Sequence, residues 1–200
     1  MGKIIHGNKN FGYAPITDDG LGNLSFGTPV MIPGLVSVEI EVDQSDTNIY
    51  ADDKVYCVIK GAKVRTATVN FRYIPDSYAA YLGFVKQTNG MLVDTGTFAN
   101  HCIFFETEEE DCDTGSTTKA LHYLYNVKGG EPAFESNTAE EDVEAREIEV
   151  SYSAQESTFV QDAAGNYLQY GYITRTSANG GLYDTFETNV ILPTDAPISI

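Results

Sequence analysis

Two segments in the first half of the chain alternate apolar and polar residues with a period of two. In residues 36–42, valines and an isoleucine alternate with polar residues that include Glu39 and Glu41. Residues 65–73 repeat the pattern, with Val69 and Phe71 on its apolar side. Since successive side chains of a strand point to opposite faces, both segments are predicted as strands with one buried face.

The stretch between these strands, residues 43–54, is predicted as an extended loop. It is too polar for a buried strand and too long for a tight turn, and it ends on the acidic sequence Tyr50-Ala51-Asp52-Asp53. Loops of about 12 or more residues are usually functional or mobile. A strand near residues 55–60 follows it.

The N-terminal residues read as an arm or hairpin, residues 11–16 and 24–32 around a polar turn. Pro15, Pro29 and Pro33 interrupt it. Because proline cannot donate to a strand ladder, these prolines argue against a central strand here.

Residues 74–83 change period and predict one short helix lying across the edge of the sheet. Asp76 is placed to cap the first amides, Tyr78, Tyr81 and Leu82 share a face, and Gly83 supplies a left-handed stop.

The rest of the chain continues the β pattern, interrupted by acidic loops at residues 106–115 and 131–144. The pattern predicts a mainly β fold, a β-sandwich or barrel with one short flanking helix. Residues 1–155 are expected to form a β-sandwich domain with an N-terminal arm, and residues 156–200 a C-terminal β-hairpin or arm packed on it. The further predicted strands are 101–106, 121–127, 146–152, 158–161, 167–174 and 186–192, with turns at 165–166 and 179–181.

The charge of the chain is strongly negative and uneven. The formal net charge is −17; residues 1–100 hold 8 basic and 10 acidic residues, and residues 101–200 hold 4 and 19. Nucleic-acid binding needs clustered Lys and Arg, which the sequence lacks, so stable DNA binding is excluded. No apolar run approaches the roughly 20 residues of a membrane span, and the start lacks a signal-peptide core, so a soluble protein made in the cytoplasm is expected.

Three cysteines, Cys57, Cys102 and Cys112, are an odd number without metal-ligand spacing. Free thiols are expected, with Cys57 and Cys102 buried as small apolar side chains.

The sequence carries no catalytic, metal or cofactor motif. The acidic run 106–113 lacks the ligand spacing and glycine of a calcium loop, and adjacent strand residues such as Asp52 and Asp53 point in opposite directions. The three histidines are scattered, and the glycine pairs lack a following lysine and helix. We therefore expect no enzyme, no metal and no cofactor, and a protein that assembles or binds.

Several short motifs, taken in order, resemble the major tail tube protein of long non-contractile-tailed phages. No single motif is specific; their order and spacing over about residues 1–155 carry the resemblance. They are Gly12–Pro15, Phe26–Gly34 with the valine–glutamate strand behind it, Tyr50–Asp53, Ile74–Asp76, Leu82–Gly83 and Tyr125–Val127 before Pro132.

The resemblance implies a structural virion protein whose hexameric rings stack into a hollow tube, through which the genome is ejected. It implies contacts between rings from the 43–54 loop and the terminal arms, which here points to Tyr13, Pro15, Asp46, Ile49, Tyr50, Asp52 and Asp53. The implied partners are further copies of the chain, a tape measure protein, a tail terminator and baseplate or distal tail proteins. Viral DNA would pass without specific binding, in a tail assembled in the host cytoplasm and without membrane association.

Such a tube passes DNA best if its lumen repels phosphate. The carboxylates of Glu39, Glu41, Glu147 and Glu149 point away from the predicted core and are the candidates for that lumen. One alternative is a carbohydrate- or receptor-binding β-sandwich of a tail tip or cell surface, using the tyrosines of residues 121–125 and 167–172. A hydrolase based on Asp52 and Asp53 is the remaining alternative, without a motif to support it.

Overall fold

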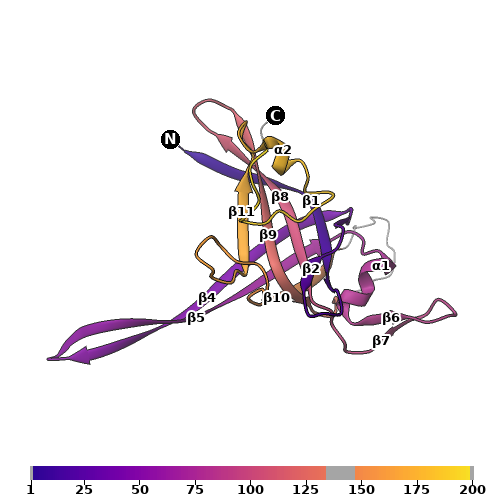
Figure 1. Ribbon diagram of the computed structural model, residues 1–200, viewed down its shortest axis with the longest axis horizontal. Coiled ribbons are helices and arrows are strands. Elements are labelled where there is room, and N and C mark those ends of the chain that lie inside the picture. Colours follow the sequence, from indigo (N-terminus) through magenta and orange to yellow (C-terminus); the bar gives the residue numbers. More distant parts are fainter. Residues whose placement is uncertain (1, 134–146, 199–200) are drawn as a thin grey trace, which may run out of the picture.

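One large antiparallel sheet dominates the protein, whose computed structural model describes residues 2–133 and 147–198 (Figure 1). Its strands follow the order β2-β1-β8-β9-β10-β5-β4, with β3 paired to β1 and β11 to β9; β6 and β7 form a separate hairpin. The predicted mainly β fold is confirmed. The elements are β1 (Lys3–Asp18), β2 (Leu24–Phe26), β3 (Val30–Met31), β4 (Leu35–Ala51), β5 (Lys54–Phe71), α1 (Asp76–Ala79), the 3-10 turn η1 (Ala80–Leu82), β6 (Phe84–Lys86), β7 (Leu92–Asp94), β8 (His101–Asp111), β9 (Thr117–Gly129), β10 (Ile148–Ala154), β11 (Tyr170–Thr174) and α2 (Gly180–Tyr183).

The predicted loop at residues 43–54 is wrong, because this stretch is the outer half of a long hairpin. β4 and β5 stay paired from Leu35↔Phe71 to Ala51↔Lys54. The turn residues Asp52 and Asp53 have φ of 52° and 58°, the left-handed geometry of a two-residue hairpin turn. The hairpin projects well beyond the rest of the molecule (Figure 1).

The N-terminal segment forms the predicted hairpin, since β1 pairs with β2 around residues 19–23, but its first strand lies inside the sheet. β1 pairs with β8 on one side and with β2 and β3 on the other. Pro15 still takes part in this pairing, because its carbonyl accepts a hydrogen bond from Gly27 N at 2.8 Å. The expectation drawn from the prolines is therefore corrected.

Side chains from opposite faces of the sheet build two cores. On β8, Ile103 and Phe105 enter the first core, whereas Cys102 and Phe104 enter the second. The first core closes the sheet on itself: β8, β9 and β10 separate β1 from β5, yet the rings of Phe11 and Phe71 lie 4.8 Å apart. The curled sheet is thus barrel-like around the first core.

The predicted helix is present as α1 and η1, and it covers one end of the first core. Tyr78 and Leu82 are buried, and Gly83 ends the helix with φ of 92°. The predicted cap is wrong: Pro75 occupies the N-cap position, and Asp76 instead accepts a hydrogen bond from Lys86 at 2.7 Å.

A buried hydrogen-bond chain joins this helix to the sheet. Tyr78 Oη lies 2.9 Å from Tyr152 Oη and 2.8 Å from His101 Nε2, while His101 Nδ1 lies 3.0 Å from the Ala99 carbonyl. That carbonyl can only accept, so Nδ1 carries the proton, Nε2 accepts from Tyr78, and Tyr78 accepts from Tyr152. Burial lowers the pKa of His101 to about 4, against the opposing hydrogen bond to Ala99.

The acidic run predicted as a loop at residues 106–115 is a strand up to Asp111. Lys9 binds Glu108 at 2.6 Å and Lys3 binds Glu109 at 3.3 Å, so basic residues of β1 offset the repulsion between the carboxylates of β8. The second predicted acidic loop, 131–144, falls mostly outside the described residues. Cys57 is exposed on β5, contrary to expectation, and Cys102 is buried as predicted.

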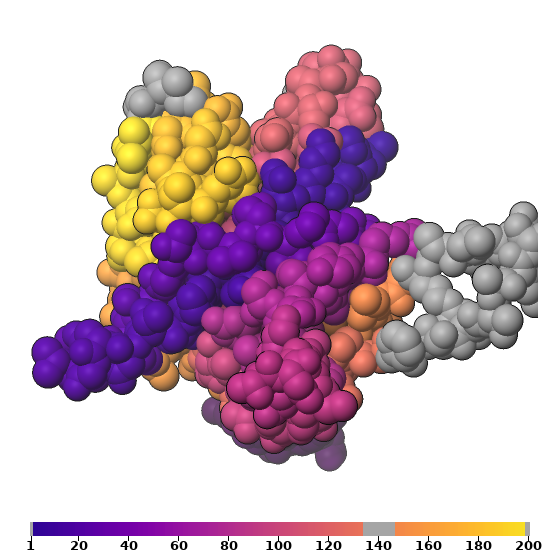
Figure 2. All heavy atoms as spheres, turned by 90° about the vertical axis from the view of Figure 1, so that its right-hand side faces the viewer, coloured from indigo at the N-terminus to yellow at the C-terminus, as the bar shows by residue number. Residues whose placement is uncertain are grey.

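Residues 156–198 cover the second core without the strands predicted at 158–161 and 186–192; only an isolated bridge, Gln161↔Tyr167, occurs at the first of these. Phe186, Val190 and Ile191 pack there from turns that follow α2, itself unexpected. The yellow C-terminal lobe in Figure 2 stands beside the separate projection of the β8–β9 turn. Tyr183 Oη fastens the lobe by donating to the buried Glu106 carboxylate at 3.0 Å, which Lys119 approaches at 3.1 Å.

Tyr183→Phe is expected to lower the free energy of unfolding by about 1–3 kcal/mol, because the buried Glu106 carboxylate loses a donor. Urea denaturation of the purified subunit measures this. Tyr172→Phe, whose ring is exposed, is the matched control and should leave stability unchanged. Equal stability of the two variants would contradict the fastening role of Tyr183.

Candidate assembly interface

The outer half of the β4–β5 hairpin exposes apolar side chains on a two-stranded ribbon. Tyr50 is 66% exposed and Tyr56 78% exposed, and Ile49, Val58 and Ile59 are also exposed. An isolated two-stranded hairpin is marginally stable in water. Exposed apolar residues gathered on such a ribbon are typical of an interaction surface.

Local pairing explains why the ribbon forms at all. The Asp46 carboxylate accepts from Lys60 Nζ at 2.8 and 3.0 Å, and Gln44 Nε2 donates to the Gly61 carbonyl at 2.8 Å. The pairing shifts register near Gln44 and again near Ile49, where the chain adjusts its twist.

The structure brings most of the predicted contact residues together on this ribbon. Asp46, Ile49 and Tyr50 lie on β4, and Asp52 and Asp53 form its turn.

Tyr13 and Pro15 lie elsewhere, on β1. Tyr13 is only 5% exposed and its ring packs 4.6 Å from that of Tyr78. We therefore assign Tyr13 to the core of the subunit and leave it out of the contact surface.

The second strand of the ribbon was predicted near residues 55–60 and is present as part of β5, but its pairing with residues 43–51 was not foreseen. Residues 55–59 read Val-Tyr-Cys-Val-Ile, a continuous apolar run in which only Cys57 was expected to be buried, and every one of them is exposed. The polar sequence of the partner strand could have indicated this exposure, because an apolar strand that pairs with a polar strand has little core to pack against.

A second candidate surface is the polar face shared by β4, β5 and β10, here called the acidic face. Residues on the three strands lie side by side in register, as Glu39, Thr68 and Ser151 do. Its nine side chains include three carboxylates and no base. They are Ser37, Glu39, Glu41, Thr66, Thr68, Asn70, Glu149, Ser151 and Ser153.

The predicted lumen residues thus fall into two groups. Glu39, Glu41 and Glu149 share the acidic face and are exposed. Glu147 precedes β10 and lies 3.3 Å from Arg72 Nη2, which offsets its charge. The face lies on the side of these strands opposite the first core, which Ala67, Val69 and Val150 enter.

Other chemistry finds little support in the geometry. Among residues 2–133 and 147–198, no group of three His, Cys, Asp or Glu could hold a metal ion, and no helix is long and apolar enough to cross a membrane. Asp52 and Asp53 sit in the exposed hairpin turn at the tip of the ribbon.

The tyrosine surface of the binding alternative is mostly used inside the subunit. Tyr123 and Tyr125 are buried in the second core, and Tyr170 is half-buried beside His122, whose Nδ1 lies 2.7 Å from its hydroxyl. Tyr167 and Tyr172 remain exposed. Two separate tyrosines make a weaker sugar platform than the sequence pattern indicated.

Comparison with known proteins agrees with the assembly reading. A search of curated proteins found no match. The family model described as "Phage tail tube protein" matches residues 2–196, nearly the whole chain. The chain therefore belongs to the phage tail tube protein family, a family of structural proteins of the virion tail.

Proposed function

We propose that this protein assembles into hexameric rings that stack into the tail tube, the conduit for genome ejection into the host. The observation that carries the proposal is the projecting hairpin with its exposed apolar ribbon. The tape measure protein, tail terminator and baseplate proteins are the partners expected at the inside and the ends of such a tube. Assembly would take place in the host cytoplasm.

The two edges of the main sheet support ring formation. β4 stands at one end of the strand order and β2 at the other. Contact between one edge region and the opposite edge region of the next copy is heterologous and closes into a ring when the rotation permits. The hairpin leaves the body along the longest axis and supplies a separate, head-to-tail contact between rings.

The acidic face suits the wall of a channel for DNA. Carboxylates there repel phosphates across a Debye length of about 8 Å at physiological salt, while the hydroxyls of Thr66, Thr68 and Ser151 offer no cationic grip. DNA in contact with this wall would slide without binding.

Negative-stain electron microscopy of the purified protein over a range of concentrations tests the proposed function. Hollow tubes with a regular axial repeat are expected above a threshold concentration. Single globules at every concentration, together with retention of a glycan on an affinity column, would replace the proposal with the binding alternative.

Charge reversal on the acidic face tests the channel wall. A triple variant is expected to slow DNA exit by about tenfold, because each new cation can hold a passing phosphate. It combines Glu39→Lys, Glu41→Lys and Glu149→Lys. Ejection from assembled tails, followed by a DNA-binding dye at two salt concentrations, measures it. Glu187→Lys, on the C-terminal lobe, is the control; ejection that is as fast as wild type in the triple variant would remove the acidic face from the lumen.

A further inference from the structure

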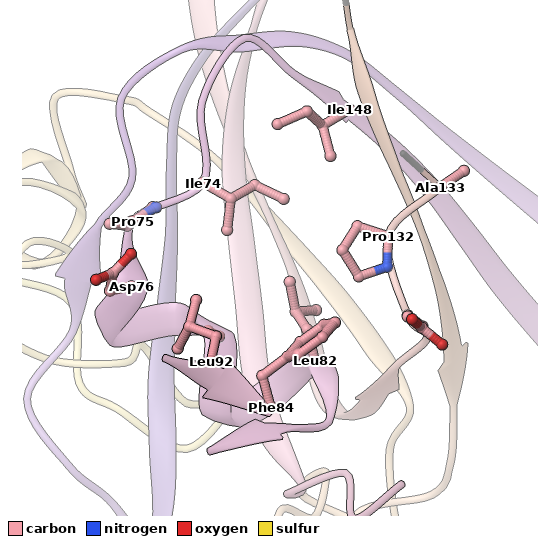
Figure 3. A pocket seen from close by; sticks show the side chains of 11 residues that line it. Ile74, Pro75, Asp76, Leu82, Phe84, Leu92, Pro132, Ala133 and Ile148 are labelled. Carbon is pink, nitrogen blue, oxygen red and sulfur yellow. The ribbon is translucent and has the colours of Figure 1, made fainter. Parts of the chain in front are cut away.

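An apolar pocket of about 340 Å³ opens under the β6–β7 hairpin. Figure 3 shows Ile74, Leu82, Phe84 and Leu92 reaching into it from one side and Pro132 from the other. The pocket lies beyond the first core, and among the described residues no side chain fills it. It has the size and apolar lining of a site that receives another molecule.

The pocket and the projecting hairpin lie at opposite ends of the subunit. With the longest axis horizontal, the β4–β5 tip is at the far left of Figure 1, and α1, β6 and β7 are at the right. Two complementary surfaces at opposite ends generate a head-to-tail contact that repeats without closing.

We propose that this pocket receives the β4–β5 tip of a second copy of the chain, with Tyr56 and Tyr50 as the side chains that enter it. The proposal rests on the proposed tube function and adds the receiving site for the contact between rings.

The dimensions agree with that occupant. An engineered cavity of about 150 Å³ holds one benzene ring, so a pocket of about 340 Å³ has room for two rings. Tyr50 and Tyr56 are the two aromatic residues of the tip, and both are more than half exposed. Aromatic side chains in apolar pockets are the usual anchors of protein interfaces.

The charges at the two surfaces also match. Glu131 lines the pocket, and Lys54 follows the hairpin turn; neither has an ion pair within the described residues. Asp76, the other carboxylate at the pocket, is already held by Lys86 at 2.7 Å. A pair between Lys54 of one copy and Glu131 of the next would satisfy both groups.

The area involved explains why the contact needs a ring. A fully covered tyrosine buries roughly 150–250 Å², so the tip stays well below the roughly 800 Å² per partner of a stable pairwise interface. One insertion is therefore weak, and several identical insertions between two rings act together. Pairs of free subunits should not persist through this contact.

A charge swap tests the pairing in the full chain. Lys54→Glu and Glu131→Lys alone should each raise the threshold concentration for tube formation by about tenfold, and the double variant should restore it. Light scattering across a concentration series gives the threshold. Tyr56→Ala should raise it by at least as much, and Tyr172→Ala, a tyrosine of similar exposure on β11, should not.

Disulfide cross-linking tests the position of the contact independently of the charge swap. In a Cys57→Ser, Cys112→Ser background, oxidation of tubes carrying Tyr56→Cys and Leu92→Cys should give a ladder of linked subunits on non-reducing gels, because a disulfide needs Cα atoms within about 7 Å. Tyr56→Cys with Tyr167→Cys is the control pair. The pocket proposal would be overturned if tubes form normally but cross-link no more than the control pair, and if the charge-swap variants assemble like the wild type. The tube function would then still stand. A wild-type protein without tubes would instead overturn both.

Discussion

Replacing residues 46–60 with a two-residue Asn-Gly turn is expected to give a folded subunit that no longer forms tubes. None of these residues belongs to either core, so the body keeps its packing. Their apolar side chains are exposed in the subunit and would contribute only in the assembly. Several contacts of about 1–2 kcal/mol each would be lost together, which raises the threshold concentration by at least about a hundredfold.

Circular dichroism and thermal unfolding establish whether the shortened subunit is folded, and electron microscopy reports assembly. Asp52→Asn with Asp53→Gly is the matched control: it keeps both strands and the left-handed turn, and should assemble. Tubes from the shortened chain would show that rings join through other surfaces.

Acidification is expected to destabilise the subunit through His101, by about 3 kcal/mol between pH 6.5 and pH 4. An unfolded histidine takes up its proton near pH 6.5, whereas burial lowers the pKa of His101 in the folded state to about 4. The unfolded state therefore binds more protons in this window, so the stability is complete above pH 6.5 and falls as the pH decreases. Burial also lowers the pKa of His122, which acts in the same direction.

Urea denaturation at several pH values measures this dependence. His101→Gln should be less stable at pH 7 but lose less on acidification, and His6→Gln, an exposed residue, should follow the wild type. The hydrogen bond from Lys9 lowers the pKa of Glu108, so that carboxylate loses its contribution only below about pH 4.5, outside most of the window. A His101→Gln variant with an unchanged pH slope would contradict the buried neutral histidine.

The alternating segments were predictable where one face enters a core; Val38 and Ile40 pack against the first core, but Val42, predicted on the same face, is 51% exposed. Ala67, Val69 and Phe71 are buried as their period of two indicated, and so are Val150 and Tyr152. The helix was predictable from the shared face of Tyr78 and Leu82, but its cap was not, since Asp76 has the stronger partner in Lys86.

The hairpin and the acidic strand escaped prediction for a common physical reason. Neither the outer part of β4 nor residues 108–111 of β8 has a full core face, so their sequences carry no apolar period. Pairing with another strand stabilises them. Lys9, for example, binds Glu108, which lies 99 positions away in the sequence. A single sequence does not display such pairing.

The family resemblance pointed to residues 43–54 as a contact between rings, but as an extended loop. That stretch is instead the outer end of β4 and the hairpin turn. Cys57 was assigned to the interior, because apolar character by itself does not distinguish a core from an interface that is filled only in the assembly. The receiving pocket combines Leu82, Leu92 and Pro132 from separate elements, which no local pattern joins.

The position of β4 at the end of the sheet also bears on aggregation before assembly. A long edge strand with unpaired amides and carbonyls is a template for uncontrolled fibre growth. Here the pairing with β5 changes register at three places, and Glu39 and Glu41 stand along the strand. The resulting bends and like charges oppose a flat, in-register stack of identical edges.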